Sequence, residues 1–293
     1  MTRNSLLLLG ILVLPACTVG PDYKRPPEVK ASPDWIEATG SGSVDALWWT
    51  RLGNEHLNAL IAQANANSPD VRVAQARLRE ARANRDAVAG TGLPRLNASG
   101  AATTNRVSEN GQIPIANIPG FPRDFDLYDA GFDASWEIDL WGHAARQTEA
   151  ASARAEAVEA EQRSVLVSLH AEIAQSYIDL RTAQALLASA KADALAQDQI
   201  AHLTRQRLDA GESSRSDYVR AESRARASAA QTPVLEADIR AAIDRIALLV
   251  GQPPEAMDDV LIGAAPIPTA PADIAMGLRS DMLRRRPDIM AAE

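Results

Sequence analysis

The sequence predicts an α+β membrane protein in which a membrane-spanning β-hairpin is followed by a long α-helical hairpin. Three observations carry this prediction. A helical pattern runs without proline or glycine from His143 to Ala210. Apolar residues alternate with acidic or small ones from Tyr128 to Leu140, as on the two faces of a strand. An apolar leader ends at the single cysteine, Cys17.

Composition narrows the class of protein further. Hydrophobic residues make up 46% of the 293 residues but aromatic residues only 4%, which favours long helices over a compact enzyme core. The net charge of -8 argues against nucleic-acid binding. One cysteine excludes an internal disulfide framework, and with four histidines we expect no metal site and no cofactor.

Residues 1–16 are interpreted as a signal peptide, because nine apolar residues from Leu6 to Leu14 are too few to span a bilayer. The following Cys17 completes a segment that resembles a bacterial lipobox, so we predict that Cys17 is lipidated. An ordinary signal peptide with an incidental thiol is the alternative. Thr18 stands where aspartate would favour retention in the inner membrane, which by resemblance points to the outer membrane. Residues 17–46 are rich in proline and predict an extended tether.

A short pattern occurs twice. Pro69-Asp70 and Pro287-Asp288 each precede an aliphatic residue and a helical stretch, with proline and an acidic residue suited to the first turn. We interpret the second occurrence as the start of a second structural repeat over residues 280–293, so that the chain covers about the first of two repeats of a longer protein. A chance helix start is the alternative.

Residues 47–93 predict short helices, and residues 94–141 predict a β-hairpin with a loop over Glu109 to Pro122. Thirteen residues from Tyr128 to Leu140 extend about 43 Å, or about 30 Å across a bilayer when tilted. Because an open sheet edge cannot lie in lipid, several copies must assemble if this hairpin spans a membrane. A half-buried hairpin in a soluble protein has the same pattern and remains the alternative.

Residues 142–250 predict two antiparallel helices joined by a turn at Gly211. Small and aliphatic residues spaced alternately by three and four, from Leu166 to Ala194, predict a coiled-coil seam. Pro233 should bend the returning helix. A helical hairpin of this kind also occurs in scaffolds that contain no channel. Residues 251–279 predict a linker, because Gly251 and the prolines after it end the second helix.

Several segments together resemble the bacterial outer-membrane factors, the TolC-like efflux channels, in the lipoprotein branch that serves resistance-nodulation-division pumps. Apart from the lipobox, they are Val19-Gly20-Pro21-Asp22-Tyr23, Leu47-Trp48-Trp49, the stretch from Ala134 to Gly142, the stretch from Ala171 to Arg181, and Arg285-Arg286-Pro287-Asp288-Ile289. The resemblance implies a homotrimer with a twelve-stranded transmembrane barrel and a periplasmic helical tunnel. It also implies a passive conduit for small molecules and drugs, acting with a periplasmic adaptor and an inner-membrane pump, and 251–279 as an equatorial linker.

The resemblance also implies roles for particular residues. The turn that docks on the adaptor would contain Gly211, Glu212, Ser214 and Arg215, and Asp217 would be a candidate gate residue. The alternative for Asp217 is that it favours a helix N-terminus. A separate hypothesis follows from the alternation itself: if the strand lines a channel, its acidic odd positions would face the lumen and disfavour anions; they are Asp129, Asp133, Glu137 and Asp139.

Two other classes of protein share some of these features. A periplasmic coiled-coil adaptor or scaffold lipoprotein would also carry a lipobox and a helical hairpin, but it lacks a thirteen-residue alternating strand. An enzyme is the weakest interpretation, because the sequence contains no phosphate-binding loop, no HExxH motif and no nucleophile elbow.

Overall fold

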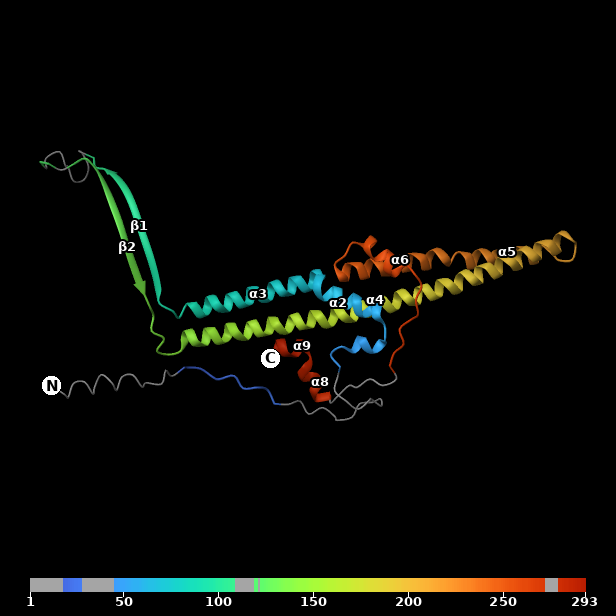
Figure 1. Ribbon diagram of the computed structural model, residues 1–293, viewed down its shortest axis with the longest axis horizontal. Helices are drawn as coiled ribbons and strands as arrows, with labels where there is room; N and C mark the ends of the chain where they lie inside the picture. Colours follow the sequence, from blue (N-terminus) through green and yellow to red (C-terminus); the bar gives the residue numbers. More distant parts are fainter. Residues whose placement is uncertain (1–17, 28–44, 109–118, 121, 272–278) are drawn as a thin grey trace. The chain divides into compact units, whose positions relative to one another are not determined.

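A computed structural model describes residues 18–27, 45–108, 119–120, 122–271 and 279–293 (Figure 1). The signal peptide, Cys17 and most of the loop between the strands lie outside the described residues. In chain order the elements are η2 (Trp48–Leu52), α2 (Glu55–Asn67), α3 (Pro69–Gly90), β1 (Arg95–Arg106), β2 (Asp124–Ser135), α4 (His143–Asp209), α5 (Arg215–Ala229), α6 (Thr232–Val250), η4 (Pro254–Met257), α7 (Asp258–Leu261), α8 (Arg279–Arg285) and α9 (Pro287–Ala292). Among the described residues, no helix combines the length and the apolar character needed to cross a membrane.

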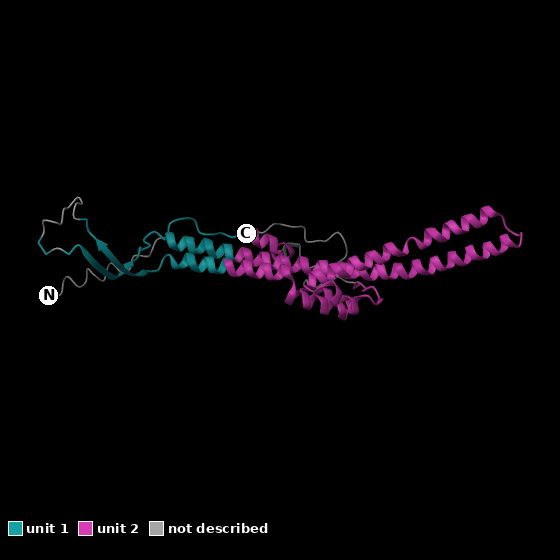
Figure 2. Cartoon of the chain, turned by 90° about the horizontal axis from the view of Figure 1, so that it is seen from above, with its two compact units in different colours: residues 1–25, 81–155 teal, residues 26–80, 156–293 magenta. Residues whose placement is uncertain are grey.

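The chain divides into two compact units, residues 1–25 with 81–155 and residues 26–80 with 156–293 (Figure 2). The second unit contains the hydrophobic core, where α2, α4 and α6 pack together. Large apolar side chains from all three helices are fully shielded from solvent there; they include Leu57, Ile61, Ile173, Leu180, Ile243 and Ile246. Burying a side chain of this size stabilises the fold by about 1.5–3 kcal/mol.

The long helix α4 begins at His143 and ends at Asp209, within one residue of the predicted bounds. The predicted seam faces the core of the second unit, since Leu169, Ile173, Ser176 and Leu180 are all buried. The seam prediction is therefore confirmed for this part of the helix.

The returning helix is interrupted next to Pro233, where the sequence predicts a bend. It consists of α5 and α6, and Pro233 lies in the first turn of α6, where its missing N–H costs nothing. Gly251 ends α6 with a left-handed backbone (φ 70°). A side chain at this position would lie 2.4 Å from the carbonyl oxygen of Asn67, so the end of α6 meets the chain where α2 passes into α3.

The first unit contains the hairpin, in which β1 and β2 pair antiparallel from Arg95↔Ser135 to Arg106↔Asp124. The predicted bounds of the second strand were wrong: β2 begins at Asp124 and ends at Ser135, rather than running from Tyr128 to Leu140. Residues after Ser135 keep the alternating pattern but turn toward α4. The predicted helix starts at Pro69 and Pro287 are both confirmed.

Candidate channel elements

The two faces of the hairpin differ in polarity. In this register, even-numbered residues of β1 pair with even-numbered residues of β2 and share one face. Tyr128 and Phe132 lie on this even face with their side chains 77% and 82% exposed. Asp129 and Asp133 lie on the odd face, where Asp133 is paired with Asn97. One face is therefore apolar and exposed over these rungs, and the other is acidic and polar.

Only two of the four predicted lumen-facing carboxylates belong to the strand. Asp129 and Asp133 lie within β2, whereas Glu137 and Asp139 follow its last residue, Ser135. Asp139 instead caps α4: its carboxylate accepts backbone N–H groups from His143 at 2.7 Å and Ala145 at 3.2 Å. Its charge also matches the positive end of the helix dipole. The alternation in the sequence predicts that Asp139 lies on the acidic face of the strand, but it does not predict that Asp139 caps α4.

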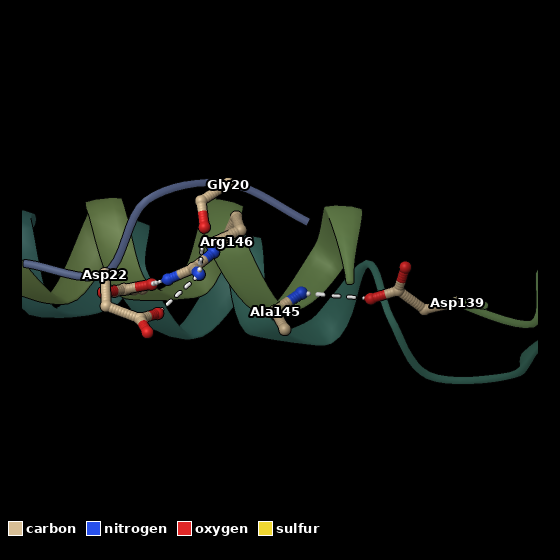
Figure 3. Close-up of polar contacts among 6 residues, drawn as sticks. Gly20, Asp22, Asp139, Ala145 and Arg146 are labelled. Carbon is tan, nitrogen blue, oxygen red and sulfur yellow. Dashed lines mark hydrogen bonds and ion pairs between the residues drawn. The ribbon is translucent and has the colours of Figure 1, made fainter. Parts of the chain in front are cut away.

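A clamp of hydrogen bonds, centred on Arg146, holds residues 19–22 against the corner between β2 and α4. The Arg146 guanidinium on α4 donates to the Asp22 carboxylate at 2.7 Å and to the Gly20 carbonyl at 3.2 Å (Figure 3). Its other amino group donates to Glu149 at 2.6 Å. The backbone N–H of Val19 donates to the Trp141 carbonyl at 3.0 Å.

Gly142 makes the close approach of this segment possible. Its φ of 77° is a left-handed conformation that favours glycine, and a Cβ there would lie 2.6 Å from Cγ2 of Thr18. Thr18 follows Cys17 directly, so the clamp and Gly142 together fix the chain one residue after the predicted lipidation site.

The predicted tip turn joins α4 to α5. Gly211 adopts φ 79°, and the N–H of Glu212 donates back to the Arg207 carbonyl at 2.8 Å, which closes the end of α4. Glu212 and Arg215 are exposed around this turn, and so is Ser214. The turn therefore presents polar groups to solvent.

Asp217 forms a capping box with Ser214 at the start of α5. The Ser214 hydroxyl donates to its carboxylate at 2.6 Å, and the backbone N–H of Asp217 donates to the Ser214 hydroxyl oxygen at 3.1 Å. These bonds from Ser214, with the charge of Arg220, hold the pKa of Asp217 below its ordinary value of 3.8. The alternative role at a helix N-terminus is thus seen directly, while the gate role stays a prediction.

Tyr218 ties α5 back to α4 beside this capping box. The Arg205 guanidinium lies 5.1 Å from the centre of the Tyr218 ring, a cation–π distance, and it also pairs with Asp209 at 3.2 Å. Nothing in the sequence pattern distinguishes Arg205 or Tyr218 from other residues of the two helices.

A buried arginine fastens the linker to α4 in the second unit. Arg181 is only 1% exposed, and its guanidinium donates to the carbonyl of Gly263 at 2.7 Å and to the side chain of Gln184 at 2.8 Å. Gln184 donates in turn to the carbonyl of Leu261 at 2.8 Å. The guanidinium also lies 4.8 Å from the centre of the Tyr177 ring. This role was not predicted, because an isolated arginine on a long helix resembles a solvated residue.

Within the described parts of the chain, no cluster of three or more His, Cys, Asp or Glu residues is arranged to hold a metal ion. The clusters of polar side chains described above mainly bind backbone groups. They cap helices, hold residues 19–22 and attach the linker to α4.

Comparison with known proteins assigns the family. Residues 60–252 match the family model of outer membrane efflux proteins. The chain is 31% identical to nodulation protein T of Rhizobium leguminosarum bv. trifolii, over 96% of this chain and 59% of that protein. It is 27% identical to the pyoverdine export outer membrane protein OpmQ of Pseudomonas aeruginosa, over 99% of this chain and 61% of that protein.

A solved structure of the outer-membrane channel OprN has the same fold, with a TM-score of 0.79 and 36% identity over 94% of this chain and 61% of that one. The chain thus spans about three fifths of the length of these relatives. The match favours the channel interpretation over the adaptor or scaffold alternative. With the amphipathic hairpin, the long helical hairpin and this match in agreement, the chain belongs to the outer membrane efflux protein family.

Proposed function

We propose that this chain forms part of the protomer of an outer-membrane channel, which exports small molecules passively across the periplasm and the outer membrane. Three protomers would close one twelve-stranded barrel, and a periplasmic adaptor and an inner-membrane pump would deliver the substrate. The pairing of an amphipathic hairpin with a 67-residue helix in one chain carries this proposal. The family match supports it.

The hairpin supplies the wall of the channel in this proposal. Its even face exposes Tyr128 and Phe132, and water is a poor solvent for such a surface. Its two outer edges are unpaired within the described chain, since the sheet contains only β1 and β2. Lipid on the even face would cover the apolar side chains, and neighbouring hairpins at both edges would supply hydrogen-bond partners for the unpaired backbone groups.

The helices supply the periplasmic tunnel. In the second unit α4 lies alongside α5 and α6, joined to α6 by the ion pair of Lys191 with Glu236 at 2.8 Å (Figure 1). The exposed turn around Gly211 would dock on the adaptor. Asp217 would take part in gating only if a partner from another helix replaced Ser214, because Ser214 now holds its carboxylate.

Lipidation of Cys17 would anchor the same protomer to the periplasmic leaflet of the outer membrane. Acyl chains contribute about 0.8 kcal/mol of membrane binding per buried CH2, so they would strengthen the attachment to the membrane that the barrel provides but would not replace the barrel. The clamp at Arg146 supports this anchor, because it fixes Gly20 and Asp22 next to the corner where the strand ends.

The acidic odd face gives the sharpest test of this function. Asp129 and Asp133 would form rings of negative charge in the lumen and make the channel prefer cations. In planar-bilayer recordings of the full-length protein, the double substitution Asp129→Lys with Asp133→Lys should reverse this preference. The matched control is Asp126→Asn, which removes a carboxylate from the even face and should leave selectivity unchanged.

Two results would count against the proposal. Cation preference that survives the double charge reversal would remove Asp129 and Asp133 from the lumen. Full-length protein that inserts into the bilayer but never shows a stepwise conductance would contradict the channel itself.

A further inference from the structure

We infer that the loop-side edge of the bilayer crosses this hairpin between Tyr128 and Asp126, and that the remaining rungs of the sheet project beyond the acyl chains. The inference rests on the proposed membrane role of the hairpin. It specifies which rungs, meaning pairs of facing residues on β1 and β2, contact acyl chains and which contact lipid headgroups and water.

The even face is apolar along the half of the hairpin nearest α4. From Leu96↔Ala134 to Ala102↔Tyr128, every residue of this face is apolar or glycine; the intervening pairs are Ala98↔Phe132 and Gly100↔Ala130. Each of these residues is exposed. Over these rungs the even face carries no charge and no side-chain hydrogen bond donor except the Tyr128 hydroxyl, so it can contact acyl chains.

The even face becomes polar and charged at the next pair of residues. Thr104 is paired with Asp126, and the Thr104 hydroxyl donates to the Asp126 carboxylate at 2.9 Å. Arg106 is paired with Asp124 and forms an ion pair at 3.4 Å. All four side chains lie on the even face. Because a charged residue on the lipid face is costly at depth and nearly neutral at the interface, these two rungs must lie at or beyond the headgroups.

The alternation of side chains between the two faces continues without interruption to these last two pairs. The register is continuous from Arg95↔Ser135 to Arg106↔Asp124, so no bulge rotates the side chains of Asp124 and Asp126 to the other face. The odd face changes in the opposite sense to the even face. It carries apolar Phe125 and Leu127 near the loop, and acidic Asp129 and Asp133 further along the strand. A strand that stayed in lipid over its whole length would keep one apolar face throughout.

Aromatic residues mark both ends of the resulting band. Tyr128 lies at its loop-side end, where a ring with a polar hydroxyl suits the headgroup level. At the other end Trp136 and Trp141 are 59% and 70% exposed, and the indole N–H of Trp136 donates to the Gly92 carbonyl at 3.1 Å. From Tyr128 to Trp136, which directly follows the end of β2, the chain can extend about 26 Å. A tilt of about 40° reduces this to about 20 Å, most of the roughly 25 Å apolar band of outer-membrane barrels.

Single cysteines on β1 test this edge with small changes in volume. Ala98→Cys lies in the band opposite Phe132, and Thr104→Cys lies on the same face opposite Asp126. Ser99→Cys is the matched control on the odd face, opposite Gly131. Each variant of the full-length protein is labelled with an environment-sensitive fluorophore in phosphatidylcholine–phosphatidylglycerol vesicles, and quenching by lipids spin-labelled along the acyl chain is measured.

The label at residue 98 should be strongly quenched. The label at residue 104 should lose this quenching down to the level of residue 99, while a water-soluble quencher should reach it. Quenching at residue 104 equal to that at residue 98 would overturn the inference and leave the channel proposal standing. Absence of lipid quenching at residue 98 would instead overturn the membrane role of the hairpin, and this inference with it.

Discussion

The helical core buries its large apolar side chains within the chain, whereas the hairpin exposes them. In the second unit, side chains such as Ile173 and Ile246 are wholly shielded by the chain's own helices. In the first unit, Tyr128 and Phe132 on β2 are largely exposed, and the strands contact mainly each other. The difference teaches that the core buries its apolar side chains within this chain, whereas a two-stranded sheet alone is at best marginally stable in water and needs further strands or another packing surface.

The largest expected effect separates these two regions directly. Ile246→Ala should destabilise the core by about 2–5 kcal/mol, because it deletes a fully buried side chain and leaves a cavity. Urea unfolding of residues 18–293, followed by circular dichroism, measures this loss.

The matched control lies two residues further along α6. Leu248 is 68% exposed, so Leu248→Ala should cost less than about 0.5 kcal/mol. Phe132→Ala on the hairpin should be similarly silent in water but should weaken assembly of the full-length protein in vesicles. Equal losses for Ile246→Ala and Phe132→Ala in water would break the comparison.

A smaller effect is expected at the buried arginine of the core. Arg181→Met should cost about 1–3 kcal/mol, because the carbonyls of Leu261 and Gly263 lose a buried donor. The linker should also become accessible, which chymotrypsin cleavage near Leu261 measures. Gln184→Met is the companion variant, and it should release the same segment. A linker that stays as resistant as in the unsubstituted chain would show that Arg181 does not hold it.

Gly142 offers a test at the corner of the first unit. Gly142→Ala should displace residues 18–22, since the new Cβ would collide with Thr18. Faster trypsin cleavage after Lys24 measures this displacement. Gly53→Ala is the control, because Gly53 has a similar φ of 62° but a Cβ there would have no atom within 4 Å. Both substitutions should cost about 1 kcal/mol of backbone strain, and only Gly142→Ala should free the segment.

The smallest effect is expected at the exposed tip. The pKa of Asp217 is lowered in the folded chain, so its contribution to the start of α5 is present above pH 3.8 and is lost as the pH falls through the lowered value. Asp217→Asn should remove this pH dependence, seen as hydrogen-exchange protection of the first amides of α5. Glu212→Gln, in the same turn, should leave it unchanged. A pH dependence that persists in Asp217→Asn would contradict the capping role.

The sequence predicted the helices more closely than the strands, for a physical reason. Helix ends are marked by single residues such as Gly211, Pro233 and Gly251, which act through local backbone geometry. The end of β2 has no such marker, because the alternation continues into Trp136 and beyond. What ends the strand there is the turn in which the Asp139 carboxylate caps α4, and this contact is visible only in three dimensions.

The candidate sites also differ in whether local sequence or three-dimensional contacts determine them. Asp129 and Asp133 could be placed on one face from their spacing alone, and the structure keeps them together. The role of Arg181 could not be predicted, since its partners are backbone carbonyls about eighty residues away. The polarity reversal at Tyr128 was present in the sequence, but only the pairing with β1 shows that Thr104 and Arg106 reverse with it.

Amide hydrogen exchange tests most directly whether the hairpin depends on lipid while the core does not. For residues 18–293 in water, we expect strong protection in α2, α4 and α6 and rapid exchange throughout β1 and β2. For the full-length protein in vesicles, we expect both strands to become protected. Strands protected equally well in water and in vesicles would contradict a membrane role for the hairpin, because the hairpin would then need neither lipid nor neighbouring strands.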